Sequence, residues 1–188
     1  MSRLVLVRHG EPALQGVCYG SLDPELSAQG REQAAALAAE LREERFDTVV
    51  ASPRARAVQT AEAFGRPVVT DERLRELDFG SFEGRTFEEI EQSEPELFRA
   101  WMETPTQIRF PGGESYSDLR DRASVALDAL RARHDSTLVV THGGVIRAGL
   151  ATWLELPDHA IFRLDQRYCG VTIVEWLGDE PVVRILNG

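Results

Sequence analysis

Short apolar runs alternate with helical patterns along most of the chain. Continuous apolar runs at residues 4–7, 48–51 and 138–140, with a shorter strand pattern at 67–70, are typical of strands buried on both faces. Between these runs, apolar side chains recur three or four positions apart, as on the inner face of a helix. These positions are Ala34, Leu37, Ala38 and Leu41, then Ala57, Ala61 and Phe64, and later Leu119, Ala123, Ala126, Leu127 and Leu130. The alternation predicts an α/β fold, a three-layer sandwich in which helices cover both faces of a mostly parallel sheet.

The remaining segments complete this outline. Ser27 is expected to cap the first helix, and Ser52, with a proline after it, to start the second. Residues 71–114 loosen into charged turns and two short helices, which predicts an insertion that closes as a lid over the carboxyl ends of the strands. Runs at 171–174 and 182–186 are typical of closing strands, for which an antiparallel arrangement is left open.

Composition narrows the class of protein. No linker divides the chain, so we expect residues 1–188 to form a single domain. Cys18 and Cys169 have no paired spacing, which suits reduced thiols, and no segment before the first strand is long and apolar enough for a signal peptide or membrane span. We therefore expect a cytoplasmic location.

The charge balance excludes several functions. All 21 basic residues are arginine, and 31 acidic residues give a net charge of -10, which argues against broad binding to nucleic acid or to an anionic membrane. Without lysine there is no Schiff-base mechanism and no Walker-type phosphate lysine. A bound phosphate would have to be held by arginines, whose planar fork suits it.

Two of the predicted strands end in a histidine followed by glycine. Arg8 and His9 follow the first strand, and His142 follows the run at 138–140. Arg56 lies in the first turn of the helix after the strand at 48–51. Because ligands collect at the carboxyl ends of parallel strands, we expect these four side chains to converge on one rim of the sheet.

Two arginines and two histidines match the needs of phosphoryl transfer. We expect Arg8 and Arg56 to hold the phosphoryl oxygens and His142 to add a third donor. His9 is the better nucleophile candidate, because the flanking arginines disfavour its protonated form. Gly143 opens the next helix, where backbone amides suit an anion.

The proton donor is not settled by spacing. Glu76 and Glu83 both fall in the segment that should fold over the rim, and either carboxyl suits a general acid. A zinc site of His9, His142 and a carboxylate is an alternative, but no HxH or HExxH spacing supports it.

Several single residues can be explained by a structural role alone. Arg8 alone could be an ion-pair partner of Glu11. His134 and His159 are expected at the surface, and Trp101 in packing. The four residues of the rim taken together indicate a phosphoryl-transfer site more specifically than any one of them alone.

An ordered series of motifs runs through nearly the whole chain. It comprises RHGE at 8–11, Ser52 with Arg56, Ala57, Thr60 and Ala61, LRE at 74–76 with FG at 79–80 and FEG at 82–84, GES at 113–115, and THGG at 141–144. This series resembles the histidine phosphatase superfamily, in its phosphoglycerate mutase-like branch.

The resemblance implies roles for these residues. They are a phosphohistidine intermediate at His9, a phosphate pocket of Arg8, Arg56 and His142, and Glu76 as general acid and base, with no metal and no cofactor. Glu76 is selected over Glu83 by the family motif alone, which leaves Glu83, with Gly143, as a substrate-binding residue. Gln15 falls where many members carry asparagine near the phosphate, and its amide is expected to donate there.

Within the family, hydrolysis is favoured over a mutase reaction, because this chain is short and has no lysine. Residues 16–26, 162–166 and 186–187 resemble the alpha-ribazole phosphatases of the cobalamin pathway. We therefore expect metal-independent hydrolysis of a small phosphorylated metabolite, alpha-ribazole 5'-phosphate in the first place. A broad-specificity phosphatase, a cofactor-dependent phosphoglycerate mutase and a non-catalytic phospholigand-binding protein are left as alternatives, as is a homodimer.

Overall fold

The computed structural model describes residues 2–133 and 135–188; His134, predicted at the surface, lies outside them. Within the described residues, a six-stranded sheet has the order β3-β2-β4-β1-β5-β6. Its strands are β1 (Arg3–Arg8), β2 (Thr48–Ala51), β3 (Val68–Thr70), β4 (Ser136–Thr141), β5 (Val171–Leu177) and β6 (Glu180–Ile185). β1 to β4 pair in parallel, whereas β5 is antiparallel to both β1 and β6. The predicted mostly parallel α/β sheet is confirmed, and the closing strands are antiparallel.

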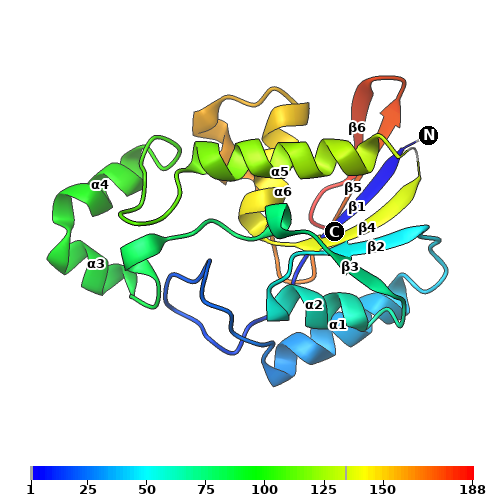
Figure 1. Cartoon of the computed structure of the whole chain (residues 1–188), viewed down its shortest axis with the longest axis horizontal. Coiled ribbons are helices and arrows are strands. Elements are labelled where there is room, and N and C mark those ends of the chain that lie inside the picture. Colours follow the sequence, from blue (N-terminus) through cyan, green and yellow to red (C-terminus); the bar gives the residue numbers. More distant parts are fainter. Residues whose placement is uncertain (1, 134) are drawn as a thin grey trace.

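Helices cover both faces of this sheet (Figure 1). α1 (Ala28–Glu40) and α2 (Ala55–Glu62) lie on one face, and α5 (Tyr116–Arg131) and α6 (Gly143–Trp153) on the other. Successive side chains of β1 alternate between two buried cores. Leu4 and Leu6 join the core under α5 and α6, whereas Val5 and Val7 join the core under α1 and α2. This double burial is why the strand reads as a continuous apolar run.

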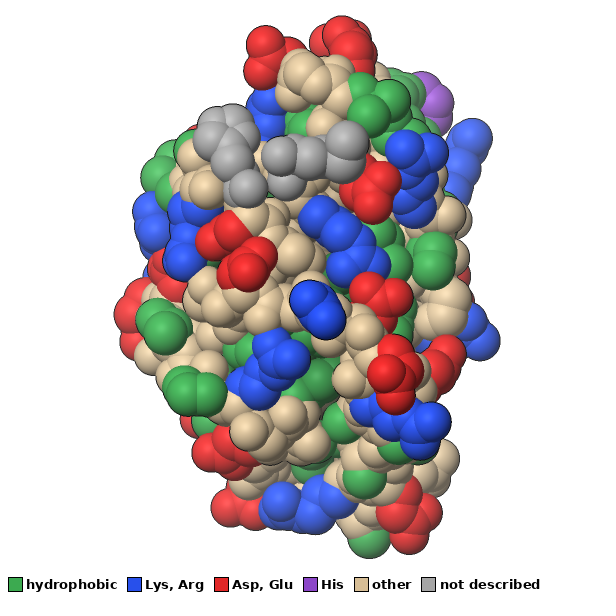
Figure 2. All heavy atoms as spheres, turned by 90° about the vertical axis from the view of Figure 1, so that its right-hand side faces the viewer, with side chains coloured by type: hydrophobic (Ala, Val, Ile, Leu, Met, Phe, Trp, Pro, Cys, Tyr) green, Lys and Arg blue, Asp and Glu red, His purple; other side chains and the backbone are tan. Residues whose placement is uncertain are grey.

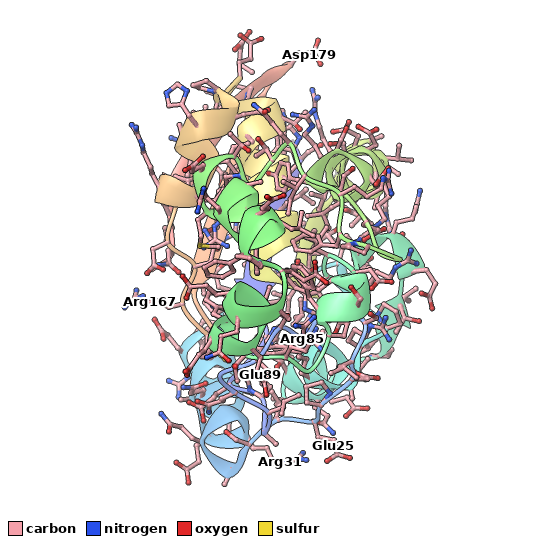
Figure 3. The ribbon with its side chains drawn as sticks, turned by 90° about the vertical axis from the view of Figure 1, so that its left-hand side faces the viewer. Glu25, Arg31, Arg85, Glu89, Arg167 and Asp179 are labelled. Carbon is pink, nitrogen blue, oxygen red and sulfur yellow. The ribbon has the colours of Figure 1, made fainter. Side chains whose placement is uncertain are left out.

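Residues 71–114, the predicted insertion, extend beyond the carboxyl ends of the parallel strands and are called the lid below (Figure 1). The lid contains α3 (Phe87–Ser93), which begins with a capping box at Thr86, and α4 (Pro95–Glu103), which begins at proline. Buried Phe82, Ile90 and Phe110 give it a small core of its own. Figure 3 looks onto the lid and shows Arg85 beside Glu89, whose carbonyl accepts from the Arg85 guanidinium at 3.1 Å.

One predicted helix start is wrong. The Ser27 hydroxyl caps α1, accepting from the Gly30 amide at 2.9 Å, as expected. α2, in contrast, begins at Ala55 with Arg54 as its cap residue, not at Ser52. The Ser52 side chain is used elsewhere, because it is bonded to a histidine distant in sequence.

The surface shows no large region of one charge on the face drawn in Figure 2, where arginine and carboxylate side chains are interspersed. His159 is exposed, as predicted. None of the helices in the described part of the chain is both long and apolar enough to cross a membrane.

Candidate active site

The pairing of β1 with β4 brings the two strand-end histidines together. Arg8 is in register with Thr141, so the residues that follow each strand emerge at the same edge. The His9 amide donates to the Thr141 carbonyl at 2.9 Å, and the rings of His9 and His142 are 5.1 Å apart between centroids. Both histidines are almost completely buried, with 2% and 0% exposure.

The hydrogen bonds of His9 identify its tautomer. Nδ1 lies 2.7 Å from the Gly10 carbonyl oxygen, which can only accept, so the ring proton sits on Nδ1. Nε2 therefore keeps its lone pair, which accepts from Nε of Arg56 at 3.3 Å. Burial, followed by the charge of Arg56, holds the pKa of His9 well below 6.5, although the Gly10 carbonyl opposes this. The result is a neutral imidazole with a lone pair at Nε2, which is what a nucleophile requires.

Arg56 is fixed by the loop between β1 and α1. Its side chain is completely buried in the first turn of α2. Nη1 donates to the Leu22 carbonyl at 3.0 Å, and Nη2 to that of Gly20 at 3.4 Å. The guanidinium is thus positioned before any ligand arrives.

The guanidinium groups of both arginines lie over tyrosine rings. The Arg8 guanidinium donates to the Gln166 carbonyl at 2.6 Å and lies 4.1 Å from the centre of the Tyr168 ring. The Arg56 guanidinium lies 5.2 Å from the Tyr19 ring. The two tyrosine hydroxyls are hydrogen-bonded at 2.9 Å. We call this pair, Tyr19 and Tyr168, the tyrosine clasp; nothing in the sequence indicated it, because its members are 149 positions apart.

His142 is the N-cap residue of α6. Its Nε2 is bonded to the Ser52 hydroxyl at 2.8 Å, which explains why that serine does not cap α2. Its Nδ1 is buried without a hydrogen-bond partner among the described residues. Burial, then the charges of Arg56 and His9, lower the pKa of His142 well below 6.5. An unpartnered ring nitrogen beside two arginines is suited to contact a ligand oxygen.

Glu76 occupies the N-terminus of α6. Its Oε2 accepts from the Gly144 amide at 3.2 Å, and Oε1 from the Leu77 amide at 2.9 Å. The anion expected at this helix start is therefore partly the protein's own carboxylate. Arg122 of α5 secures the segment by donating to the Glu76 carbonyl at 2.9 Å and to that of Arg75 at 2.5 Å.

Glu83 makes a different set of contacts. Its carboxylate accepts from the amides of Gly20, Ser21, Leu22 and Phe79 at 2.9–3.1 Å. It thereby ties the loop that holds Arg56 to the lid. Gln15 is exposed. Neither Glu83 nor Gln15 lines the cavity formed by Arg8, His9, Arg56 and Glu76, and His142 and Gly143 are outside its lining as well. A Cβ at Gly143 would lie 3.8 Å from Nε of Arg8.

A cavity of about 180 Å³ joins the functional side chains to the lid. It is lined by Arg8, His9, Val17, Cys18, Tyr19, Arg56, Glu76, Phe79, Phe87 and Trp101. Its polar end is formed by the arginines and His9, and its other end by apolar and aromatic side chains. Trp101 packs against Phe110, with ring centroids 5.1 Å apart, and also faces the cavity, which goes beyond the packing role expected of it.

The zinc alternative finds no ligand set. Across residues 2–133 and 135–188, no group of three or more histidine, cysteine, aspartate and glutamate side chains is placed to hold a metal ion. Arg8 does not pair with Glu11 either; the Glu11 carboxylate accepts from the Ser27 hydroxyl at 2.8 Å.

Comparison with known proteins agrees with this geometry. Residues 4–188 match the Histidine phosphatase superfamily (branch 1). The chain is 38% identical over 156 residues to phosphoserine phosphatase 1 of Hydrogenobacter thermophilus, covering 79% of this chain and 74% of that protein. It is 36% identical over 158 residues to phosphoglycerate mutase-like protein 4 of Arabidopsis thaliana, covering 78% and 69%. The solved alpha-ribazole phosphatase from Shigella flexneri superposes with a TM-score of 0.89 at 28% identity, over 99% of this chain and 96% of that one. The chain belongs to the histidine phosphatase superfamily.

Proposed function

We propose that this chain hydrolyses small phosphomonoesters, without a metal, by transferring the phosphoryl group to Nε2 of His9. The observation that carries the proposal is the state of His9, a neutral buried ring whose Nε2 lone pair accepts from Nε of Arg56. Arg8 and Glu76 line the same cavity.

The reaction would proceed in two steps. Arg8, Arg56 and His142 bind the phosphoryl oxygens, and Nε2 of His9 attacks phosphorus. The bond from phosphorus to the ester oxygen breaks, and Glu76, which enters this step in its protonated form, gives its proton to the departing alkoxide. In the second step Glu76 takes a proton from water, whose oxygen attacks phosphorus. The bond between phosphorus and Nε2 then breaks, its electron pair returns to His9, and inorganic phosphate leaves.

The cavity lining supports hydrolysis rather than a mutase reaction. A mutase must hold its substrate's carboxylate while the phosphoryl group is returned at another position. Apart from Glu76 and the groups assigned to phosphate, the cavity is lined by apolar or aromatic side chains: Val17, Cys18, Tyr19, Phe79, Phe87 and Trp101. That lining holds no second anion-holding group, and a single arginine, Arg147, lines the adjoining cavity.

For the substrate, we propose alpha-ribazole 5'-phosphate. The resemblance at residues 16–26, 162–166 and 186–187 supports this, as does the Shigella flexneri alpha-ribazole phosphatase neighbour. Phe79 and Trp101, which line the same cavity as Glu76, suit a leaving group that carries a ring. Phosphoserine is the second candidate, favoured by the Hydrogenobacter relative.

The test is release of inorganic phosphate by EDTA-treated protein from four esters: alpha-ribazole 5'-phosphate, phosphoserine, 3-phosphoglycerate and an aryl phosphate. We expect release from the ribazole ester to dominate and to vanish in His9→Ala. His159→Ala, which changes an exposed histidine, is the matched control and should retain the activity. Similar weak release from all four would support a broad-specificity phosphatase. Tight binding without release would overturn hydrolysis in favour of a phospholigand-binding protein.

A further inference from the structure

A second cavity adjoins the first at Glu76. It has a volume of about 120 Å³. It is lined by Glu76, Leu77, Phe79, Trp101, Pro105, Tyr116, Leu119, Gly144, Arg147 and Phe162. Glu76, Phe79 and Trp101 line both cavities. The proposed proton donor therefore stands at the junction between them.

This junction fixes the direction in which a substrate extends. With the phosphoryl group held by Arg8, His9 and Arg56, the ester oxygen must lie at Glu76 to receive its proton. The carbon skeleton of the leaving alcohol is attached to that oxygen. Since Glu76 lines both cavities, that skeleton can extend from the first cavity into the second.

The walls of the second cavity are mostly flat and apolar. Phe79 and Trp101 form the lid side, with ring centroids 5.9 Å apart. Tyr116 and Phe162 form the opposite side, also 5.9 Å apart. Such walls favour a ring over a small, strongly hydrated alcohol, because only a ring covers the aromatic surface.

Two polar groups lie among these rings. Tyr116 is buried, with 2% exposure, and its hydroxyl has no hydrogen-bond partner in the described part of the chain. Arg147 donates through Nε to the Leu164 carbonyl at 2.8 Å, and its guanidinium lies 5.8 Å from the Phe162 ring centre. No hydrogen bond within the described residues engages its two terminal nitrogens. Both side chains can donate to acceptors on a ring or a sugar.

We propose that this second cavity is the leaving-group subsite, and that it takes the heteroaromatic ring of a nucleoside-type 5'-monophosphate. The inference rests on the proposed hydrolysis through His9 and adds where the leaving group binds. The ring lies between the Phe79 and Phe162 sides, with Tyr116 donating to an acceptor on it. Arg147 donates to the sugar.

Matched esters isolate the contribution of the ring. Alpha-ribazole 5'-phosphate and adenosine 5'-monophosphate share with ribose 5-phosphate the phosphate and a primary 5'-oxygen, but only the first two carry a ring. We expect kcat/KM for at least one ring-bearing ester to exceed that for ribose 5-phosphate by about tenfold or more. Equal values for all three would overturn the subsite.

Variants of residues that line the second cavity test whether the preference for ring-bearing esters arises there. Phe162 is half exposed, so Phe162→Ala should fold; Tyr116→Phe removes only the hydroxyl. Each should lower kcat/KM for the preferred ring-bearing ester about tenfold more than for ribose 5-phosphate. The matched control is Leu154→Ala, which changes a similarly exposed residue just beyond the far end of α6 and should leave the preference unchanged. Equal losses on both kinds of ester would overturn the assignment.

Different results would overturn the leaving-group subsite and the hydrolysis through His9. Phosphate release without a ring preference, together with a phosphorylated His9, overturns the subsite and leaves the hydrolysis standing. No release from any ester, ribose 5-phosphate included, overturns the hydrolysis and the subsite with it.

Discussion

At the scale of single residues, the site depends on a few contacts that fix ring and guanidinium orientation. The Gly10 carbonyl sets the tautomer of His9, and the Ser52 hydroxyl holds His142. Both imidazoles are kept neutral by burial and by Arg56, which also donates to Nε2 of His9. The same arginine thus orients His9 and depresses its basicity.

Neutral buried histidines make stability depend on pH. The pKa values of His9 and His142 are lowered in the folded state but near 6.5 in the unfolded chain. As pH falls below about 6.5, the unfolded chain takes up protons that the folded chain does not, so the free energy of unfolding falls. Each histidine contributes a slope of up to about 1.4 kcal/mol per pH unit.

Urea unfolding between about pH 6.5 and 5 tests this slope. As pH falls, we expect the free energy of unfolding to decrease less steeply for His142→Gln than for the unchanged protein. The difference in slope should correspond to about one proton fewer taken up on unfolding. The carboxylates are the same in the two proteins, so their contribution cancels when the two slopes are compared. His159→Gln, at an exposed position, should follow the unchanged protein. Parallel curves for His142→Gln and the unchanged protein would contradict burial of a neutral His142.

The tyrosine clasp predicts a graded effect on phosphate binding. Tyr168→Ala removes the ring that lies 4.1 Å from the Arg8 guanidinium. We expect the inhibition constant of inorganic phosphate to rise about three- to tenfold, the size of a partly buried cation–π contact. Tyr168→Phe keeps the ring and loses only the bond to Tyr19, so its effect should be smaller. An equal effect of the two variants would show that the ring does not position Arg8.

At the scale of elements, the start of α6 positions Glu76, the proposed proton donor. A Cβ at Gly144 would lie 2.2 Å from Oε1 of Glu76, so only glycine leaves that carboxylate in place. Because the obstructed atom is the end of a flexible side chain, Gly144→Ala should change stability by less than about 1 kcal/mol.

Activity should respond far more than stability. We expect Gly144→Ala, like Glu76→Gln, to lower kcat for an alkyl ester by about a hundredfold. An activated aryl ester, whose leaving group needs less protonation, should be affected much less. Steady-state kinetics on the two esters checks this, and equal losses on both would contradict the acid role of Glu76.

Glu83 links two segments of the chain through hydrogen bonds. Its carboxylate joins the loop at residues 20–22, which holds Arg56, to Phe79 in the lid. Glu83→Gln replaces an accepting oxygen by an amide nitrogen that faces backbone N–H groups. We expect a loss of about 2–3 kcal/mol in unfolding free energy, together with reduced activity. Glu91→Gln, at an exposed position of α3, is the control. Unchanged stability in Glu83→Gln would refute this structural role.

At the scale of the whole molecule, the sequence indicated the fold because each core strand is buried on both faces. The apolar run at residues 4–7 therefore stood out, and the histidine after it could be placed at the sheet edge. Parallel pairing with β4 then brought His142 to the same edge. These features follow from local pattern and from the rules of parallel sheets.

Contacts between distant segments could not be predicted in this way. Ser52 follows a strand and precedes a proline, so a helix cap was expected; its hydroxyl instead bonds a ring 90 positions away. Glu83 reaches backbone amides of a loop about 60 positions earlier. Such bonds depend on how loops pack against the lid, and one sequence carries no spacing that reveals them.

Because the chain is acidic overall, we expect it to bind phosphate only where arginines are concentrated, at one end of the molecule. A net charge of -10 disfavours anions at long range, so affinity must come from the two arginines at the carboxyl ends of the strands. The proposed transfer of the phosphoryl group to His9 would add covalent chemistry to this binding of phosphate.

The most direct test is to trap that covalent state. The protein is mixed briefly with an ester carrying a radiolabelled phosphoryl group, quenched in alkali and digested. We predict label on the peptide that contains His9, stable in alkali and lost in acid, as expected for a phosphorylated imidazole. It should be present in His159→Ala and absent from His9→Ala. Phosphate release from His9→Ala at the rate of the unchanged protein would contradict the account.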